Sequence, residues 1–215
     1  MLFFIINPLA GRGHGLAVWK KIEEDSRTFL ESEGFRIFFT EGRGNAKAIA
    51  REITEDSQGE KKIIVIGGTG TLNEVVDGVK LDGDRVSLAF LPVCKENDFV
   101  RGLDKSYKAP MNIQKLLENK ERKVDYGIVE GSTRHRRFVV GAGMGFDAAV
   151  MNELLAVRSD ICPKEKAVGV KGKKSVFQFL FNRSGTLAYI YAFLKGLRSC
   201  LLYTSPSPRD GLLSR

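Results

Sequence analysis

The chain has 215 residues, 43% of them hydrophobic and 28% charged, so it can bury one sizeable core and part of a second. Its apolar runs, such as 63–66 and 188–194, are shorter than the roughly 18 to 20 residues of a membrane span, and no spanning helix is expected. The amino terminus lacks the basic region and the cleavage site of a signal peptide, which predicts a cytoplasmic chain. The sequence has three cysteines, which are widely spaced: Cys94, Cys162 and Cys200. Neither a disulfide scaffold nor a zinc site is therefore expected.

The formal net charge of +8 suits an anionic partner, which leaves nucleotide phosphates, nucleic acid and an anionic membrane surface as alternatives. Basic residues gather at 134–137 and 164–174. For both clusters, two interpretations are equally supported: a solvated loop, or a surface that faces the membrane or the substrate. Nucleic acid ranks last among the partners, because the basic residues lack the interleaved aromatic side chains of a stacking surface.

The first half of the sequence alternates strand and helix patterns. Leu2 to Ile6 is a continuous apolar run closed by Asn7-Pro8, which is typical of a strand buried on both faces of a parallel sheet. Apolar residues then recur at helical spacing over 16–32, and that helix should end at Gly34. The alternation continues with a strand at 37–39, a helix at 45–53, a strand at 62–66, a helix at 72–79, a strand at 86–91, and helices from about 98 and over 111–118. Together these elements predict a parallel α/β domain.

The pattern changes from Val124 onward. Residues 124–129 and 137–140 read as two strands joined by a polar turn, which predicts a hairpin and the start of a second, β-rich domain. Apolar helical segments follow at 146–157 and 175–197. The last stretch, 200–215, has no periodicity and resembles translated sequencing-adaptor read-through, so we expect a non-native tail.

The predicted domains are therefore 1–123, an α/β nucleotide-binding domain; 124–199, an incomplete β-rich domain; and 200–215, the tail. The natural protein is expected to continue beyond Ser199.

The strongest local signal is the stretch 63–79, in which a buried strand runs into Gly67-Gly68-Thr69-Gly70-Thr71 and directly into a helix. Glycines allow a polyphosphate to approach the backbone, and the N–H groups at a helix start stabilise negative charge. This pattern predicts a phosphate site, although glycine turns between strand and helix also occur for packing reasons. It matches neither the P-loop spacing nor the dinucleotide fingerprint.

A second loop, NPLAGRG at 7–13, follows the first strand and carries Asn7, Gly11 and Gly13. Open α/β sheets bind ligands at the carboxyl ends of their strands. Thr40 and the residues from 92 to 98 follow two further strands at the same edge, so one shared crevice is predicted. Taken singly, a threonine in the position of Thr40 is more often a turn residue than a ligand.

Five segments in this order and spacing resemble the bacterial diacylglycerol kinase and related lipid kinase family over roughly 1–199. They are NPLAGRG (7–13), TEGRGNA (40–46), GGTGTLNEVVDG (67–78), LP with NDFVRGL (91–103) and GAGMGFDAAV (141–150). The resemblance implies an α/β nucleotide domain followed by a β-sandwich domain, and transfer of the γ-phosphoryl group of ATP to diacylglycerol or a similar lipid alcohol with Mg²⁺. It also implies peripheral contact with the anionic inner membrane surface and a possible homodimer.

Carried over position by position, the resemblance implies nucleotide contacts from three loops and a metal-linked carboxylate at Asp98. The catalytic general base is not assigned, because the family's base lies beyond the end of this chain, and the chain is therefore expected to be nearly inactive. The implied nucleotide contacts are Asn7, Pro8, Gly11, Thr40, Gly67, Gly68, Thr69, Gly70, Thr71, Leu72, Asn73, Glu74 and Lys95.

Two departures from the family pattern keep other functions open. Thr69 stands where the family has an aspartate, and Cys94-Lys95 stands where it has Gly-Thr, so Lys95 offers a charge to phosphate in place of a threonine. A nucleotide-binding pseudoenzyme is one alternative. An NAD kinase-like enzyme, which shares the glycine motif, is the other.

Overall fold

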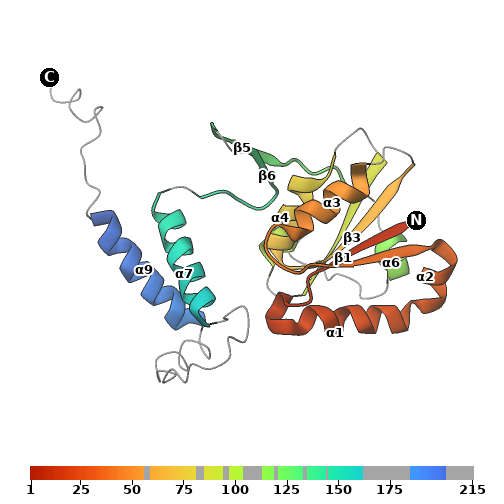
Figure 1. Cartoon of the computed structure of the whole chain (residues 1–215), viewed down its shortest axis with the longest axis horizontal. Helices are drawn as coiled ribbons and strands as arrows, with labels where there is room; N and C mark the ends of the chain where they lie inside the picture. The colour runs from red at the N-terminus through yellow and green to blue at the C-terminus, as the bar shows by residue number, and fades with distance from the viewer. Residues whose placement is uncertain are drawn as a thin grey trace. The chain divides into compact units, whose positions relative to one another are not determined.

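The computed structural model describes most of the chain outside a few loops and the carboxyl-terminal end. The described residues are 1–55, 59–80, 85–93, 97–103, 113–118, 121–132, 135–143, 145–161 and 185–201. They fall into two compact units, Met1–Ala142 and Gly143–Arg215. Figure 1 shows the helices and strands of each unit.

A four-stranded parallel sheet forms the centre of the first unit. The strands are β1 (Leu2–Ile6), β2 (Phe35–Phe39), β3 (Lys61–Gly67) and β4 (Val86–Pro92), in the order β2-β1-β3-β4. The two central strands are continuous apolar runs, and Phe4, Ile5 and Ile64 have no exposed surface. Strands buried on both faces require such runs because neither face meets water. The predicted parallel α/β architecture is confirmed.

One face of the sheet is covered by α3 (Asn45–Glu55) and α4 (Thr69–Gly78) (Figure 1). Side chains of both helices join Ile5 and Val65 in a common core. The two helices approach closely at Gly78, where an added Cβ would lie 2.2 Å from the carbonyl oxygen of Lys47. Glycine is therefore required there for close packing.

The opposite face is covered by α1 (Ala10–Asp25), α2 (Arg27–Glu33) and α6 (Ile113–Glu118) (Figure 1). Phe4 and Trp19 lie at the centre of this second core, with ring centroids 4.8 Å apart, and Phe35 meets Phe4 edge-on. The apolar spacing seen in 16–32 is thus the buried face of α1 and α2.

Residues 16–32 were predicted as one helix, and that prediction is wrong. The backbone at Ser26 leaves helical geometry, with φ −120° and ψ 13°, so α1 ends at Asp25 and α2 begins at Arg27. The N–H of Ser26 bonds the Ile22 carbonyl, and its own carbonyl accepts the Leu30 N–H. The turn continues the hydrogen bonding across the break, which explains why the apolar period does not reveal it.

The predicted hairpin is present as β5 (Gly127–Glu130) and β6 (His135–Phe138), which pair antiparallel. It belongs to the first unit, which extends to Ala142. The short helix predicted from Asp98 is α5 (Asp98–Leu103). The domain boundaries expected from the sequence remain predictions.

In the second unit, the described residues form α7 (Phe146–Ile161) and α9 (Gly185–Leu201). The helices pack through Val150, Leu154 and Ala192, and the rings of Phe146 and Phe193 meet edge-on at 5.3 Å. A β-sandwich in this unit stays a prediction, and the expected helical residues 175–184 lie outside the described part. Among the described residues, none of the helices has both the length and the apolar character that crossing a membrane requires.

Candidate functional site

The carboxyl ends of the four strands are tied together at one edge of the sheet. Backbone hydrogen bonds continue the ladder past the strands: Thr40 N–H to the Ile6 carbonyl at 2.8 Å, Asn7 N–H to Ile66 at 2.9 Å, and Val93 N–H to Gly67 at 3.0 Å. Each bond joins the start of one loop to a neighbouring strand. The loops predicted to share a crevice therefore start side by side, at the edge where parallel sheets bind ligands.

Asn7 connects the first loop to the glycine loop. Its side-chain Nδ2 donates to the Thr71 hydroxyl at 3.0 Å, and its Oδ1 accepts the Leu9 N–H at 3.1 Å. Thr71 is buried and lies against Gly67, where an added Cβ would be 2.9 Å from the threonine side chain. The polar groups of Asn7 and Thr71 thus hold the two loops in a fixed relation.

The glycine loop opens directly into α4. Gly68 is the N-cap residue in an extended conformation, its carbonyl accepts the Leu72 N–H, and no side chain caps this helix end. An added Cβ at Gly68 or Gly70 would meet no described atom within 4 Å. The first turn of α4 therefore presents uncapped N–H groups and the positive end of the helix dipole to space that no described residue fills, which suits the binding of an anion.

Glu74 ties a third loop to the same helix. Its Oε1 accepts the N–H of Gly44 at 2.9 Å, so the segment after β2 is held against α4. Thr40, which begins that segment, is buried. The sequence implied Glu74 as a nucleotide contact, and in the structure this carboxylate already accepts a backbone donor.

The first loop has an unusual backbone. Gly11, Arg12 and Gly13 all have positive φ, at 60°, 63° and 92°. An added Cβ at Gly11 would lie 2.7 Å from a methyl group of Val93, so the loop packs closely against the residue that follows β4. A left-handed conformation at Arg12 is uncommon for a residue with a Cβ.

A side-chain network along α4 was not predicted from the sequence. Asn73 Oδ1 accepts the Val139 N–H at 3.0 Å, and Asp77 Oδ1 accepts the Arg137 N–H at 2.9 Å. Asp77 Oδ2 also accepts a hydrogen bond from the Lys47 ammonium at 2.7 Å, which makes a salt bridge. The Arg137 guanidinium reaches the Val79 carbonyl at the carboxyl end of α4, at 2.8 Å. The helical spacing of Asn73 and Asp77 was the available signal, since residues four apart share a face.

Asp77 is charged and largely shielded from water. Burial by itself would raise the pKa of this carboxyl group, but the Lys47 hydrogen bond, the Arg137 N–H and the positive charges of Lys47 and Arg136 outweigh it. The pKa of Asp77 is therefore held below its ordinary value of 3.8. The carboxylate stays ionised at neutral pH and serves as the fixed centre of the network.

Other residues that the resemblance implied as nucleotide contacts differ in how they are placed. Pro8 lies half-buried in the turn before α1, and Leu72 is a core side chain with 2% of its surface exposed. Leu72 has no group left for a ligand, since its N–H bonds to Gly68. Lys95 and the neighbouring Cys94 lie outside the described residues, as does the side chain of Asp98.

Asn97, just before Asp98, is buried and accepts the Val100 N–H, so it caps α5. The structure therefore assigns Asn97 a local role at the start of that helix.

An Mg²⁺ ion at this edge would need oxygen donors from the chain. Within the described part of the chain, His, Cys, Asp and Glu side chains form no group of three that could hold a metal ion. Thr69 supplies a neutral hydroxyl in place of a carboxylate. Mg²⁺ in kinases is held by one or two carboxylates together with phosphate oxygens and water, and the side chain of Asp98, the carboxylate implied for it, lies outside the described residues.

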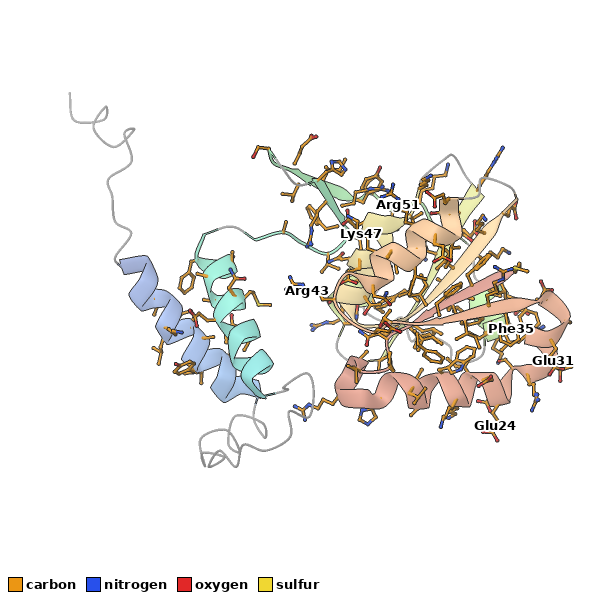
Figure 2. All side chains as sticks on the ribbon, viewed as in Figure 1. Glu24, Glu31, Phe35, Arg43, Lys47 and Arg51 are labelled. Atoms are coloured by element: carbon orange, nitrogen blue, oxygen red, sulfur yellow. The ribbon has the colours of Figure 1, made fainter. Side chains whose placement is uncertain are left out.

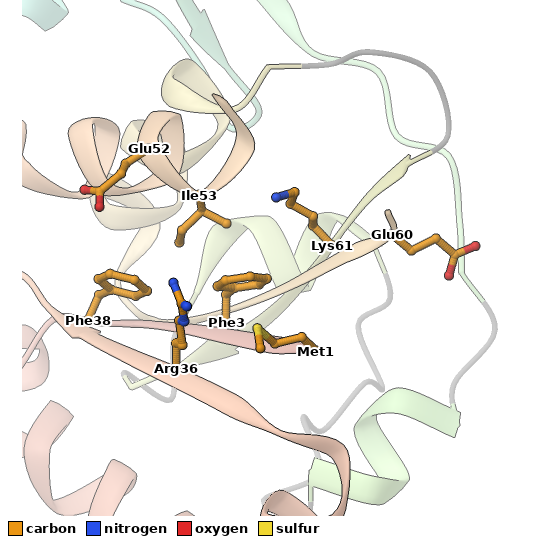
Figure 3. A pocket seen from close by; sticks show the side chains of 8 residues that line it. All are labelled: Met1, Phe3, Arg36, Phe38, Glu52, Ile53, Glu60 and Lys61. Atoms are coloured by element: carbon orange, nitrogen blue, oxygen red, sulfur yellow. The ribbon is translucent and has the colours of Figure 1, made fainter. Parts of the chain in front are cut away.

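A cavity of about 300 Å³ lies away from this edge (Figure 3). It is lined by Phe3, Phe38 and Ile53 with the charged groups of Arg36, Glu52, Glu60 and Lys61, and by Met1. Met1, Glu60 and Lys61 mark the amino ends of β1 and β3. The hollow thus sits at the opposite end of those strands from the glycine loop and is separate from the candidate site.

Comparison with known proteins agrees with the motif order. The family model described as the diacylglycerol kinase catalytic domain matches residues 1–129. The "Putative lipid kinase YtlR" of Bacillus subtilis is 39% identical over 153 residues, which is 69% of this chain and 48% of YtlR. A diacylglycerol kinase of Staphylococcus saprophyticus is 33% identical over 125 residues, or 57% of this chain and 39% of that protein.

Among solved structures, a diacylglycerol kinase from Bacillus anthracis matches with 30% sequence identity and a TM-score of 0.42, covering 54% of this chain and 36% of that one. The chain spans about half the length, or less, of the curated relatives given above. The family model covers more than half of the sequence and includes the first loop, the glycine loop and the Asn97-Asp98 pair. The chain belongs to the diacylglycerol kinase catalytic domain family.

Proposed function

We propose that this chain carries the nucleotide-binding part of an ATP-dependent lipid kinase, which phosphorylates diacylglycerol or a similar lipid alcohol. The observation that carries the proposal is the uncapped start of α4 at the carboxyl edge, with the loops after β1 and β2 tied to the same helix. ATP would supply the γ-phosphoryl group. The acceptor would be the hydroxyl of the lipid.

The chain's own groups divide into those that face the ligand and those that support the loops. In the proposed complex, the N–H groups of Thr69 and Gly70 hold phosphate oxygens, and the helix dipole stabilises their charge. Asn7, Thr71 and Glu74 keep the loops in place through hydrogen bonds within the chain. Loops that are fixed by such bonds hold their N–H groups in place for the phosphates.

The charge of the chain supports a lipid acceptor at a membrane surface. A formal net charge of +8 favours approach to anionic lipid. We propose a cytoplasmic protein that contacts the inner membrane surface peripherally and forms a homodimer. The β-rich character of the part of the protein that follows the first unit belongs to the same proposal.

Nucleotide binding by the chain itself is the first test. Isothermal titration with ATP and ADP at millimolar concentration should show weak binding, and phosphate transfer from labelled ATP to diacylglycerol in mixed micelles tests the reaction. The transfer assay needs a chimera in which the remaining half of YtlR continues this chain, because the relatives are about twice as long. Transfer no faster than without enzyme, for every lipid alcohol tried, would contradict the proposed reaction.

A nucleotide-binding pseudoenzyme is the second candidate, favoured by Thr69 in the position of a family aspartate. Replacing Thr69 by aspartate separates the two. A pseudoenzyme should gain metal-dependent nucleotide binding, whereas a working kinase should gain little. An assay with NAD as the phosphate acceptor tests the NAD kinase-like alternative.

A further inference from the structure

The segment that leaves the hairpin runs along α4 in a regular register. The amides of Arg137 and Val139, two residues apart, bond to the side chains of Asp77 and Asn73, four residues apart on the helix. Two residues of extended chain span about 6.6 Å, and four residues of helix rise about 6 Å. The two spacings match, so each second residue of the segment meets the next turn of the helix.

The segment runs antiparallel to α4. Residue numbers rise along the segment while they fall along α4, so the chain proceeds from the carboxyl end of the helix toward its amino end. After Val139 the chain bends at 139–140 and continues into the exposed residues 141 and 142, and the direction of the register points these residues toward Thr69 in the first turn of α4. That turn belongs to the glycine loop and is the proposed phosphate site.

The carboxyl end of the register is anchored by charge. Lys47, which extends from α3 (Figure 2), pairs with Asp77, and the Arg137 guanidinium donates to the Val79 carbonyl. The guanidinium also lies 5.9 Å from the centre of the Tyr126 ring. A cation at the carboxyl end of a helix is favourable for the helix dipole, and the lowered pKa of Asp77 keeps its carboxylate ionised.

We propose that Asn73 and Asp77 form a latch along α4 that sets the register of residues 137–139 and delivers residues 140–142 to the glycine-loop end of the helix. This inference rests on the proposed function, because it makes the two side chains positioning residues for phosphate transfer. The helix that begins at the phosphate site is then also the guide for the chain that leads out of the first unit.

Amide hydrogen exchange tests the latch without any need for activity. Asn73→Ala should speed exchange at the Val139 amide, and Asp77→Ala at the Arg137 amide, by about five- to tenfold, the effect of losing one hydrogen bond. Asn73→Asp keeps an oxygen acceptor and should restore protection at Val139. Asp125→Asn changes an exposed carboxylate just before the hairpin and serves as the control.

Equal exchange in the parent and both alanine variants would overturn the latch. So would Asn73→Asp exchanging as fast as Asn73→Ala while melting at the parent's temperature. Thermal melting of each variant shows whether the first unit is still folded, so a general loss of structure is recognised by faster exchange throughout β1 and β3.

Exchange with saturating ATP tests the delivery of residues 140–142. Their amides should exchange more slowly with ATP in the parent, and Asn73→Ala and Asp77→Ala should lose this effect. Calorimetric binding of ATP without protection of these amides would overturn the placement. If ATP does not bind the parent, the proposed function and the positioning role fail together, whereas the exchange of the Arg137 and Val139 amides still decides whether the latch exists.

Discussion

Gly70 lies exposed in the first turn of α4, and an added Cβ there would meet no described atom within 4 Å. Gly70→Val should therefore leave the fold nearly as stable as in the parent but place a branched side chain where a phosphate would lie. We expect nucleotide affinity to fall by at least about tenfold in isothermal titration, roughly 1.4 kcal/mol.

Ala48→Val is the matched control for Gly70→Val, since Ala48 is an exposed position in α3 and the substitution introduces the same side chain. It should leave nucleotide affinity unchanged. If Gly70→Val binds as well as Ala48→Val, the glycine loop is not the nucleotide site.

Asp77 makes stability depend on pH. Because the pKa of its carboxyl group is lower in the folded than in the unfolded chain, its contribution to stability is present above the ordinary value of 3.8 and is lost as the pH falls through the folded pKa. Asp77→Asn removes this contribution. The parent should thus melt at a higher temperature than Asp77→Asn from pH 5 to 7, and the difference should shrink below pH 3.8.

The measurement is thermal unfolding, followed by circular dichroism, of both proteins across that pH range, with Asp125→Asn as the exposed-carboxylate control. A melting difference that stays constant down to pH 2 would show that the Asp77 carboxylate is not stabilised by its neighbours.

Residue types in the loops predicted the location of the site but not the role of each side chain. Glycines after a buried strand indicate a phosphate site wherever they occur, because the physical need is for open space at a helix start. Asn73 and Glu74 were implied as nucleotide contacts, yet both already accept backbone N–H groups from distant segments. Those partners, Val139 and Gly44, become neighbours only through the fold.

At the level of elements, the contact between α3 and α4 depends on Gly78. An added Cβ would lie 2.2 Å from the Lys47 carbonyl oxygen, so Gly78→Ala must push the helices apart and disturb the neighbouring pair of Lys47 and Asp77. We expect a loss of about 1–3 kcal/mol in unfolding free energy, the usual cost of overpacking. Urea denaturation measures it.

Gly102→Ala in α5 is the control for Gly78→Ala, because no described atom lies within 4 Å of a Cβ there. Alanine should be neutral or stabilise by up to about 1 kcal/mol, as in other helices. Equal stabilities for the two variants would mean that the helices separate without cost.

The sequence period predicted the positions of those helices and strands whose apolar residues form a separate buried face. The strands at 2–6 and 86–92 and the helix at 45–55 match their expected patterns within one or two residues. The break at Ser26 did not follow, because α1 and α2 present apolar residues to the same core and the period runs on across the turn. The packing of both segments on one face decides where the chain bends.

For the whole molecule, limited proteolysis should release a stable fragment ending after Ala142. The hairpin at 127–138 belongs to the first unit and is fastened to α4, so trypsin should spare Arg136 and Arg137 and cut beyond residue 142. Mass spectrometry of the early products identifies the boundary. Early cleavage at Arg136 or Arg137, or a fragment ending near residue 124, would place the boundary before the hairpin.

The sequence alone determined the parallel α/β class, the two glycine-containing loops and the family, because these depend on local patterns: buried apolar runs, helix periods and motifs in a fixed order. Tertiary structure alone decided that the hairpin belongs with the first unit. It also decided that Asn73 and Asp77 accept hydrogen bonds from the end of the hairpin and the residue after it. Residues 73 and 139 lie 66 positions apart. A polar side chain in a helix does not reveal its partner until packing brings a distant amide within hydrogen-bond distance, and that pairing depends on the three-dimensional path of the chain.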